Sequence, residues 1–169
     1  MIDIRRLLVI ALGMLAAVVL QTTLFGEVRI GGIAPDVVIL AIALLSLRGR
    51  PETTLLVAFT VGFLFDASAS STALGLRAIA YTTVAFVAIR TRERADLGPA
   101  MVAIWVGAMT LVGIATILLV GTIFGQLAMG FGEAIRRVLL VPLFNAGIAL
   151  LLSPFTSRLL DGRRGVIGF

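Results

Sequence analysis

Long apolar segments separated by short polar stretches are the main feature of the chain. They include Leu7–Leu20 and Met101–Val120, in which polar and apolar residues do not alternate. A barrel strand in a membrane needs such alternation, whereas a continuous apolar run fits a helix surrounded by lipid. The pattern therefore predicts an all-α integral membrane protein with one membrane domain. We expect about six helices, over residues 7–25, 35–47, 52–65, 73–89, 100–124 and 134–153.

The second and third apolar segments are the least regular part of this prediction. Val37–Leu47 and Leu55–Phe65 are each shorter than the roughly 20 residues of a usual span. A re-entrant hairpin would place Arg48, Arg50 and Glu52 deep in the membrane, at about 2.5 kcal/mol or more per charged residue. Two short but complete spans, in a locally thinned bilayer, are therefore favoured.

The distribution of arginine predicts the orientation. All fourteen basic residues are arginine, and with six spans ten of them lie on the side of the termini and four on the other. Cytoplasmic loops carry the excess of basic residues, so both termini are predicted to lie in the cytoplasm. Four spans would give the same orientation. A cleaved signal peptide fits less well than an uncleaved first helix, because the first apolar run is long and no clear cleavage site follows it.

Composition agrees with this picture and narrows the chemistry. The chain is 60% hydrophobic and 14% charged, with a mean hydropathy of +1.14, which is more apolar surface than a soluble domain can bury. It has no cysteine and no histidine, so thiolate chemistry and the usual zinc ligands are excluded. The net charge of +5 comes from arginines at helix ends and is not taken as a nucleic-acid signal. No cofactor or metal is predicted.

Several polar residues near the predicted outer ends of the helices are the candidate functional residues. No pair among them has a catalytic spacing, so no enzymatic activity is predicted. Opposite charges at similar depth are expected to pair, which leaves two interpretations: the residues tie the bundle together, or they form a pocket or docking surface. Arg136 and Arg137 are the strongest candidates because they lie outside against the positive-inside trend. The full set is Gln21, Asp36, Asp66, Arg77, Arg136, Arg137 and Asn145.

Three local features complete the analysis of these residues. Pro35 and Asp36 are expected to open the second helix, and Asp66 to begin a loop of small residues that reaches position 72. Asn145 follows Pro142 by one turn. Its amide either bonds carbonyls freed by the proline or contacts another helix, and both interpretations stay open.

A series of short motifs extends across most of the chain. In order they are Leu20–Phe25, Pro35–Val38, Arg48–Glu52, Gly62–Asp66, Leu74–Tyr81, Arg136–Arg137 and Pro142–Asn145. In their order, spacing and total length they resemble the MreD family of bacterial rod shape-determining membrane proteins. The resemblance implies a fold similar to the substrate-binding subunits of energy-coupling-factor transporters and a multi-pass location in the bacterial plasma (inner) membrane.

The same resemblance implies a function. It points to a non-enzymatic subunit of the cell-elongation machinery that scaffolds MreC, with links to MreB and to RodA and its transpeptidase, in the synthesis of lateral peptidoglycan. The candidate residues would then be partner-interface or bundle-stabilising residues. The alternative is a vitamin-binding subunit of an energy-coupling-factor transporter. A channel fits the sequence less well, because no span carries a repeated polar stripe that could line a pore. A homo-oligomer stays open.

Overall fold

The structure is a computed structural model, and it describes residues 4–27, 32–68, 74–92, 98–126 and 130–161. These residues form six α-helices. No strand occurs within these ranges, so the all-α prediction is confirmed. The helices are α1 (Ile4–Glu27), α2 (Val37–Ser46), α3 (Pro51–Ser68), α4 (Leu76–Thr91), α5 (Pro99–Ile123) and α6 (Phe131–Asp161).

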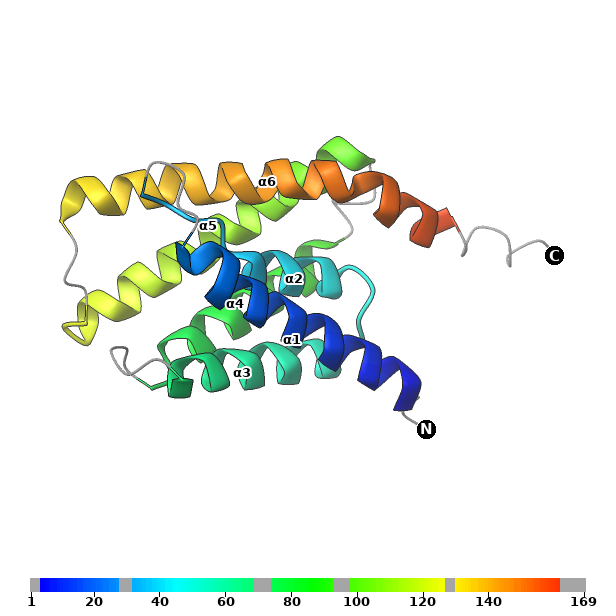
Figure 1. Ribbon diagram of the computed structural model, residues 1–169, viewed down its shortest axis with the longest axis horizontal. Helices are drawn as coiled ribbons and strands as arrows, with labels where there is room; N and C mark the ends of the chain where they lie inside the picture. Colours follow the sequence, from blue (N-terminus) through cyan, green and yellow to red (C-terminus); the bar gives the residue numbers. More distant parts are fainter. Residues whose placement is uncertain (1–3, 28–31, 69–73, 93–97, 127–129, 162–169) are drawn as a thin grey trace.

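Successive helices run in opposite directions along the long axis of the molecule, and the start of α1 and the end of α6 both lie at the right in Figure 1. The short helix α2 is central and packs against each of the other five helices. Its side chains Val38, Ile39 and Ile42 are fully buried. Because α2 has only 10 residues, it is about 15 Å long and much shorter than the helices around it.

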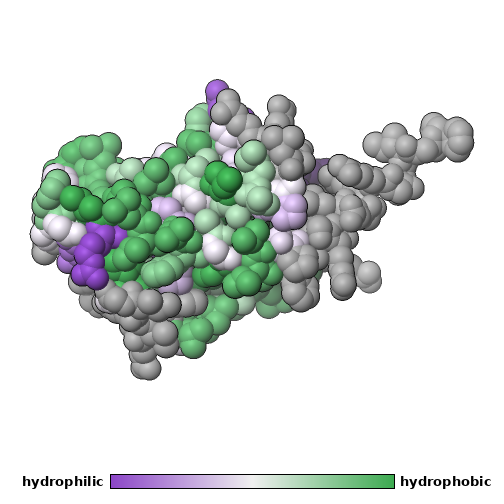
Figure 2. Space-filling model, turned by 90° about the horizontal axis from the view of Figure 1, so that it is seen from above, coloured by the Kyte–Doolittle hydropathy of each residue, from purple (hydrophilic) through white to green (hydrophobic). Residues whose placement is uncertain are grey.

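The outward-facing side chains are mostly large and apolar. On α6, Leu139, Leu143 and Leu151 are 64%, 65% and 77% exposed. Figure 2 shows hydrophobic residues over much of the coloured part of the face seen from above, with a hydrophilic patch toward its left end. Two helical segments, Pro99–Ile123 and Phe131–Ser153, have the length and hydropathy of a membrane span. An apolar exterior on helices of this kind fits a lipid environment.

The helices α3 and α4 approach each other closely at Gly62. A Cβ atom at this position would lie 2.6 Å from both the Cα and the N atom of Ala78. No side chain can turn away to relieve such a contact, because the opposing atoms belong to the backbone. Gly62 is therefore required for the packing of α3 against α4.

The observed helix boundaries differ from the predicted ones in two places that matter. Asp66 was expected to begin a loop, but α3 continues to Ser68 and Asp66 lies in its last turn. The carboxylate is held there by contacts with the next helix, described below. The last helix was expected to end at 153, but α6 continues through Pro154 to Asp161. A proline removes one backbone hydrogen bond and does not by itself end a helix.

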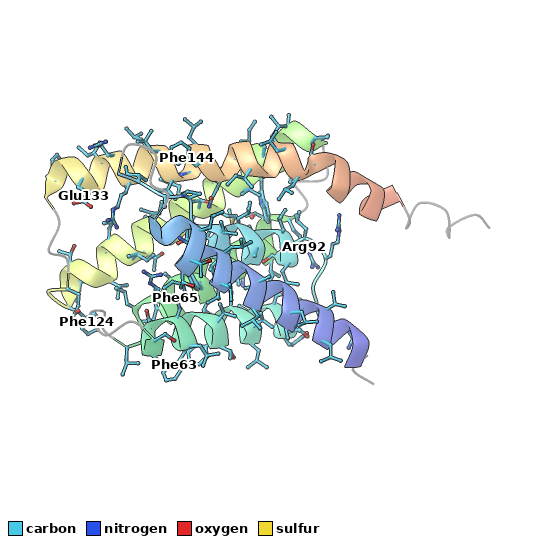
Figure 3. All side chains as sticks on the ribbon, viewed as in Figure 1. Phe63, Phe65, Arg92, Phe124, Glu133 and Phe144 are labelled. Atoms are coloured by element: carbon cyan, nitrogen blue, oxygen red, sulfur yellow. The ribbon has the colours of Figure 1, made fainter. Side chains whose placement is uncertain are left out.

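Two polar contacts connect neighbouring helices at the end of the bundle where α4 ends and α5 begins. The Arg92 guanidinium donates to the Gly49 carbonyl at 3.4 Å, which connects the end of α4 to the turn between α2 and α3 (Figure 3). The Trp105 indole N–H donates to the Thr91 hydroxyl at 3.0 Å. These bonds join α4 to its neighbours on either side.

Candidate functional site

Polar side chains from all six helices, or from residues that cap them, gather around the N-terminal end of α2. This end of α2, the last turn of α3 and the first turn of α4 all lie toward the end of the bundle opposite the chain termini (Figure 1). We call this group the polar cluster. It comprises Gln21, Asp36, Asp66, Arg77, Tyr81, Thr110 and Asn145.

Asp36 and Gln21 hold the start of α2. The Asp36 carboxylate accepts a hydrogen bond from the Ile39 N–H at 3.0 Å and so caps the helix. The Gln21 side chain of α1 donates to the Pro35 carbonyl at 3.1 Å and accepts from the Val37 N–H at 2.7 Å. One amide therefore satisfies two backbone groups flanking Asp36 and fixes α1 against the start of α2.

Asp66 performs the same task for α4 from the end of α3. Its Oδ2 atom accepts from the backbone N–H groups of Gly75, Arg77 and Ala78 at 3.1, 2.8 and 3.4 Å. Gly75 occupies the N-cap position at φ 97°, which glycine adopts without strain, and it has no side chain with which to cap the helix. A buried carboxylate from the preceding helix replaces the missing cap.

The Arg77 side chain lies between an acid and an aromatic ring. Its Nε atom is 3.8 Å from Asp66 Oδ1, and its guanidinium carbon lies 4.0 Å from the centre of the Phe65 ring. Figure 3 shows Phe65 directed toward the interior of the bundle and Phe63 on its outer edge. The ion pair and the cation–π contact both join α3 to α4.

Asn145 connects α6 to two other helices. Its Nδ2 atom donates to the backbone carbonyl of Asp36 and to the Thr110 hydroxyl, each at 2.9 Å. The Thr110 hydroxyl in turn donates to the Val106 carbonyl of its own helix. Of the two interpretations of this residue, the helix–helix contact is therefore correct. Both Asn145 and Thr110 are fully buried.

Tyr81 lies one turn after Arg77 on α4 and is fully buried. Its hydroxyl interacts electrostatically with Asp36, Asp66 and Arg77. No hydrogen bond of ordinary geometry joins it to any of the residues that the structure describes. The Arg77 side chain, one helical turn earlier on α4, is nevertheless near enough to interact with the hydroxyl as a weak donor.

The predicted site residues thus fall into two groups. Five of them come together in the polar cluster: Gln21, Asp36, Asp66, Arg77 and Asn145. Arg137 lies outside the cluster. Arg137 pairs with Glu133 of the same helix at 2.8 Å, and Figure 3 shows Glu133 at the far end of α6. Arg136 is exposed on the same turn.

The sequence analysis missed three residues that interact with the candidate residues. Tyr81 was not among the candidates, and Thr110 was not considered because it lies inside an apolar run. Glu133 was not considered as a partner of Arg137, although the spacing of four residues on a helix was a usable signal. No comparable signal identified Thr110.

The polar cluster is suited to holding helices together. Both carboxylates accept hydrogen bonds from N–H groups at the start of a helix, and both amides bond backbone atoms of a neighbouring element. Among the described residues, no group of three or more acidic, histidine or cysteine side chains could hold a metal ion.

Replacing Asn145 with alanine is expected to lower the free energy of unfolding by about 1–3 kcal/mol, because the Asp36 carbonyl and the Thr110 hydroxyl lose a buried partner. Unfolding in an SDS titration from mild detergent would measure the change. Arg137→Ala is the control on the same helix and should stay within about 0.5 kcal/mol of the parent chain, since its ion pair is exposed. Equal effects of the two substitutions would contradict the assignment.

Comparison with known proteins finds no family model, no curated protein and no solved structure that matches the chain.

Proposed function

We propose that this chain is a polytopic membrane subunit of the bacterial cell-elongation machinery that scaffolds an MreC-type partner. The proposal rests on the resemblance to the MreD family and on one observation about the polar cluster. Its buried polar groups are engaged in helix capping and helix–helix contacts, which suits a scaffold. The molecule offers its surroundings large apolar faces, which suit contact with lipid and with a partner helix.

In this proposal all six helices cross the membrane and both termini lie in the cytoplasm. The alternating helix directions support this arrangement, as does the position of the start of α1 and the end of α6 at the same end of the bundle (Figure 1). The ten arginines on the side of the termini support the orientation. The short helix α2 does not need to match the bilayer thickness, because the five neighbouring helices shield it from lipid.

Within the proposed scaffold, the polar cluster would hold the outer helices in place. Gln21 and Asn145 connect α1 and α6 to the same backbone segment at residues 35–37. The relative position of these two helices is thereby set through α2. A partner helix that packs on the outward face of α1 or α6 would meet a surface of defined shape.

The proposal is tested by purifying the tagged full chain from its native membrane in mild detergent and identifying its stoichiometric companions by mass spectrometry. We expect an MreC-type single-span protein, with or without RodA. An unrelated tagged membrane protein of similar size serves as the control. Recovery of ATPase subunits with a coupling membrane protein would instead indicate a vitamin transporter and overturn the proposal.

A second measurement tests the partner role of the exposed arginines on α6. In the same purification, the double variant Arg136→Ala and Arg137→Ala is expected to retain severalfold less partner, because both side chains lie on the surface where a partner can reach them. Arg90→Ala is the matched control, an exposed arginine near the opposite end of the bundle. Equal partner recovery from the double variant and the parent would remove these residues from the interface.

A further inference from the structure

Three polar atoms of the polar cluster are buried without a hydrogen-bond partner among the residues that the structure describes. One is Asn145 Oδ1 on α6, and the other two lie on facing helices: the Oδ1 atom of Asp66 on α3 and the hydroxyl oxygen of Tyr81 on α4. Asp66 is 1% exposed and Tyr81 is fully buried. Burying a polar group without a partner is unfavourable, so such groups in folded proteins are usually satisfied by protein atoms or by ordered water.

The two atoms face the same guanidinium. Asp66 Oδ1 lies 3.8 Å from Arg77 Nε, which is too far for a hydrogen bond although the charges attract. Tyr81 follows Arg77 by one helical turn on the same face of α4, and its hydroxyl interacts electrostatically with Arg77 and Asp66. A hydroxyl, a guanidinium donor and a carboxylate acceptor therefore surround one small region, and Asp66 Oδ1 forms no direct hydrogen bond with either of the other two groups.

Two occupants could satisfy these groups, a cation or a water molecule, and the charge balance favours water. The carboxylates of Asp36 and Asp66 are offset in part by the guanidinium of Arg77. Each carboxylate also caps a helix N-terminus, which carries about half a positive charge. The cluster is thus close to neutral, and a further cation beside Arg77 would be repelled.

We propose that an internal water molecule bridges the Asp66 carboxylate, the Arg77 guanidinium and the Tyr81 hydroxyl between α3 and α4. The water accepts hydrogen bonds from the arginine and the tyrosine and donates one to Asp66 Oδ1. This uses the capacity of a buried water, which makes about three hydrogen bonds. The water site depends on this geometry alone, so its failure would leave the proposed partner role untouched.

The direction in which Tyr81→Phe changes the unfolding temperature tests the proposal. If water bonds the Tyr81 hydroxyl, Tyr81→Phe removes a satisfied group and should lower the unfolding temperature by several degrees. If the hydroxyl is unsatisfied, the same change should leave the unfolding temperature unchanged or raise it, and the proposal is overturned. Thr54→Val is the matched control, since the Thr54 hydroxyl is also buried and unpartnered but lies at the other end of α3, away from the cluster. It is expected to be neutral or stabilising.

A direct measurement uses the fact that Tyr81 is the only tyrosine and Trp105 the only tryptophan. Both rings are isotopically labelled and the protein is placed in lipid nanodiscs. Water-edited solid-state NMR should then show faster transfer of magnetisation from water to the tyrosine Cζ than to the indole of Trp105, which is buried and bonded to Thr91. Equally slow transfer to both would overturn the proposal. So would an unfolding temperature that rises with sodium and loses this dependence in Tyr81→Phe, because a cation would then occupy the site.

Discussion

Replacing Asp66 with alanine is expected to lower the free energy of unfolding by about 3–5 kcal/mol, the range for removing one partner of a buried ion pair. The substitution leaves the N–H groups of Gly75, Arg77 and Ala78 without their acceptor at the start of α4. It also leaves the half-buried Arg77 side chain without its counter-charge. Unfolding in an SDS titration from mild detergent, followed by circular dichroism, measures the change.

Two further variants separate the contributions. Asp66→Asn keeps a carbonyl oxygen that can accept from the helix N-terminus but loses the charge, so it should fall between alanine and the parent chain. Ser68→Ala changes a nearby exposed residue whose hydroxyl bonds only the Leu64 carbonyl of its own helix, and it should have little effect. If Asp66→Ala were no more harmful than Ser68→Ala, Asp66 would not be the cap that joins α3 to α4.

The helical class and the approximate positions of the helices could be predicted from the sequence, because the apolar runs are long and interrupted by charges and glycines. The central position of α2 could not. Residues 37–46 are apolar on every side, so their pattern does not distinguish a helix surrounded by protein from one surrounded by lipid. Only the tertiary contacts show that this helix is buried.

The candidate site was predicted in part for a similar reason. Asp36, Asp66 and Arg77 are charges in apolar surroundings, and such groups must find partners wherever the chain brings them together. The loop assigned to Asp66 was wrong because the small residues after it are common in turns, whereas the N–H groups of a later helix decide its conformation. Thr110 gave no signal, because a threonine in an apolar helix usually bonds its own backbone.

Arg136 and Arg137 illustrate the opposite case. Their position against the positive-inside trend made them prominent in the sequence, but the structure places Arg137 in a local pair with Glu133 on an exposed turn. An exposed pair of this kind contributes little to folding. These arginines therefore remain partner-interface candidates, to be judged by partner recovery and not by stability.

Replacing Gly62 with alanine is expected to be among the most damaging single-methyl changes in the chain, lowering the free energy of unfolding by about 2–4 kcal/mol through overpacking. The new Cβ would lie 2.6 Å from two backbone atoms of Ala78, so α3 and α4 must separate. Ala78 also donates its N–H to Asp66, and the same separation would stretch this hydrogen bond. The cost of overpacking and the loss of the helix cap are therefore coupled.

Gly147→Ala provides the matched control for this prediction. Gly147 lies in α6 with no atom within 4 Å of the position that its Cβ would take. The substitution should be neutral or stabilise the protein by about 0.5–1 kcal/mol, since alanine favours a helix over glycine. Measured side by side in the SDS titration, the two substitutions add the same methyl group to two helices and should change stability in opposite directions. If both substitutions were neutral, the backbones of α3 and α4 would not be in contact at Gly62. The helix cap that Asp66 provides would then not depend on this close approach.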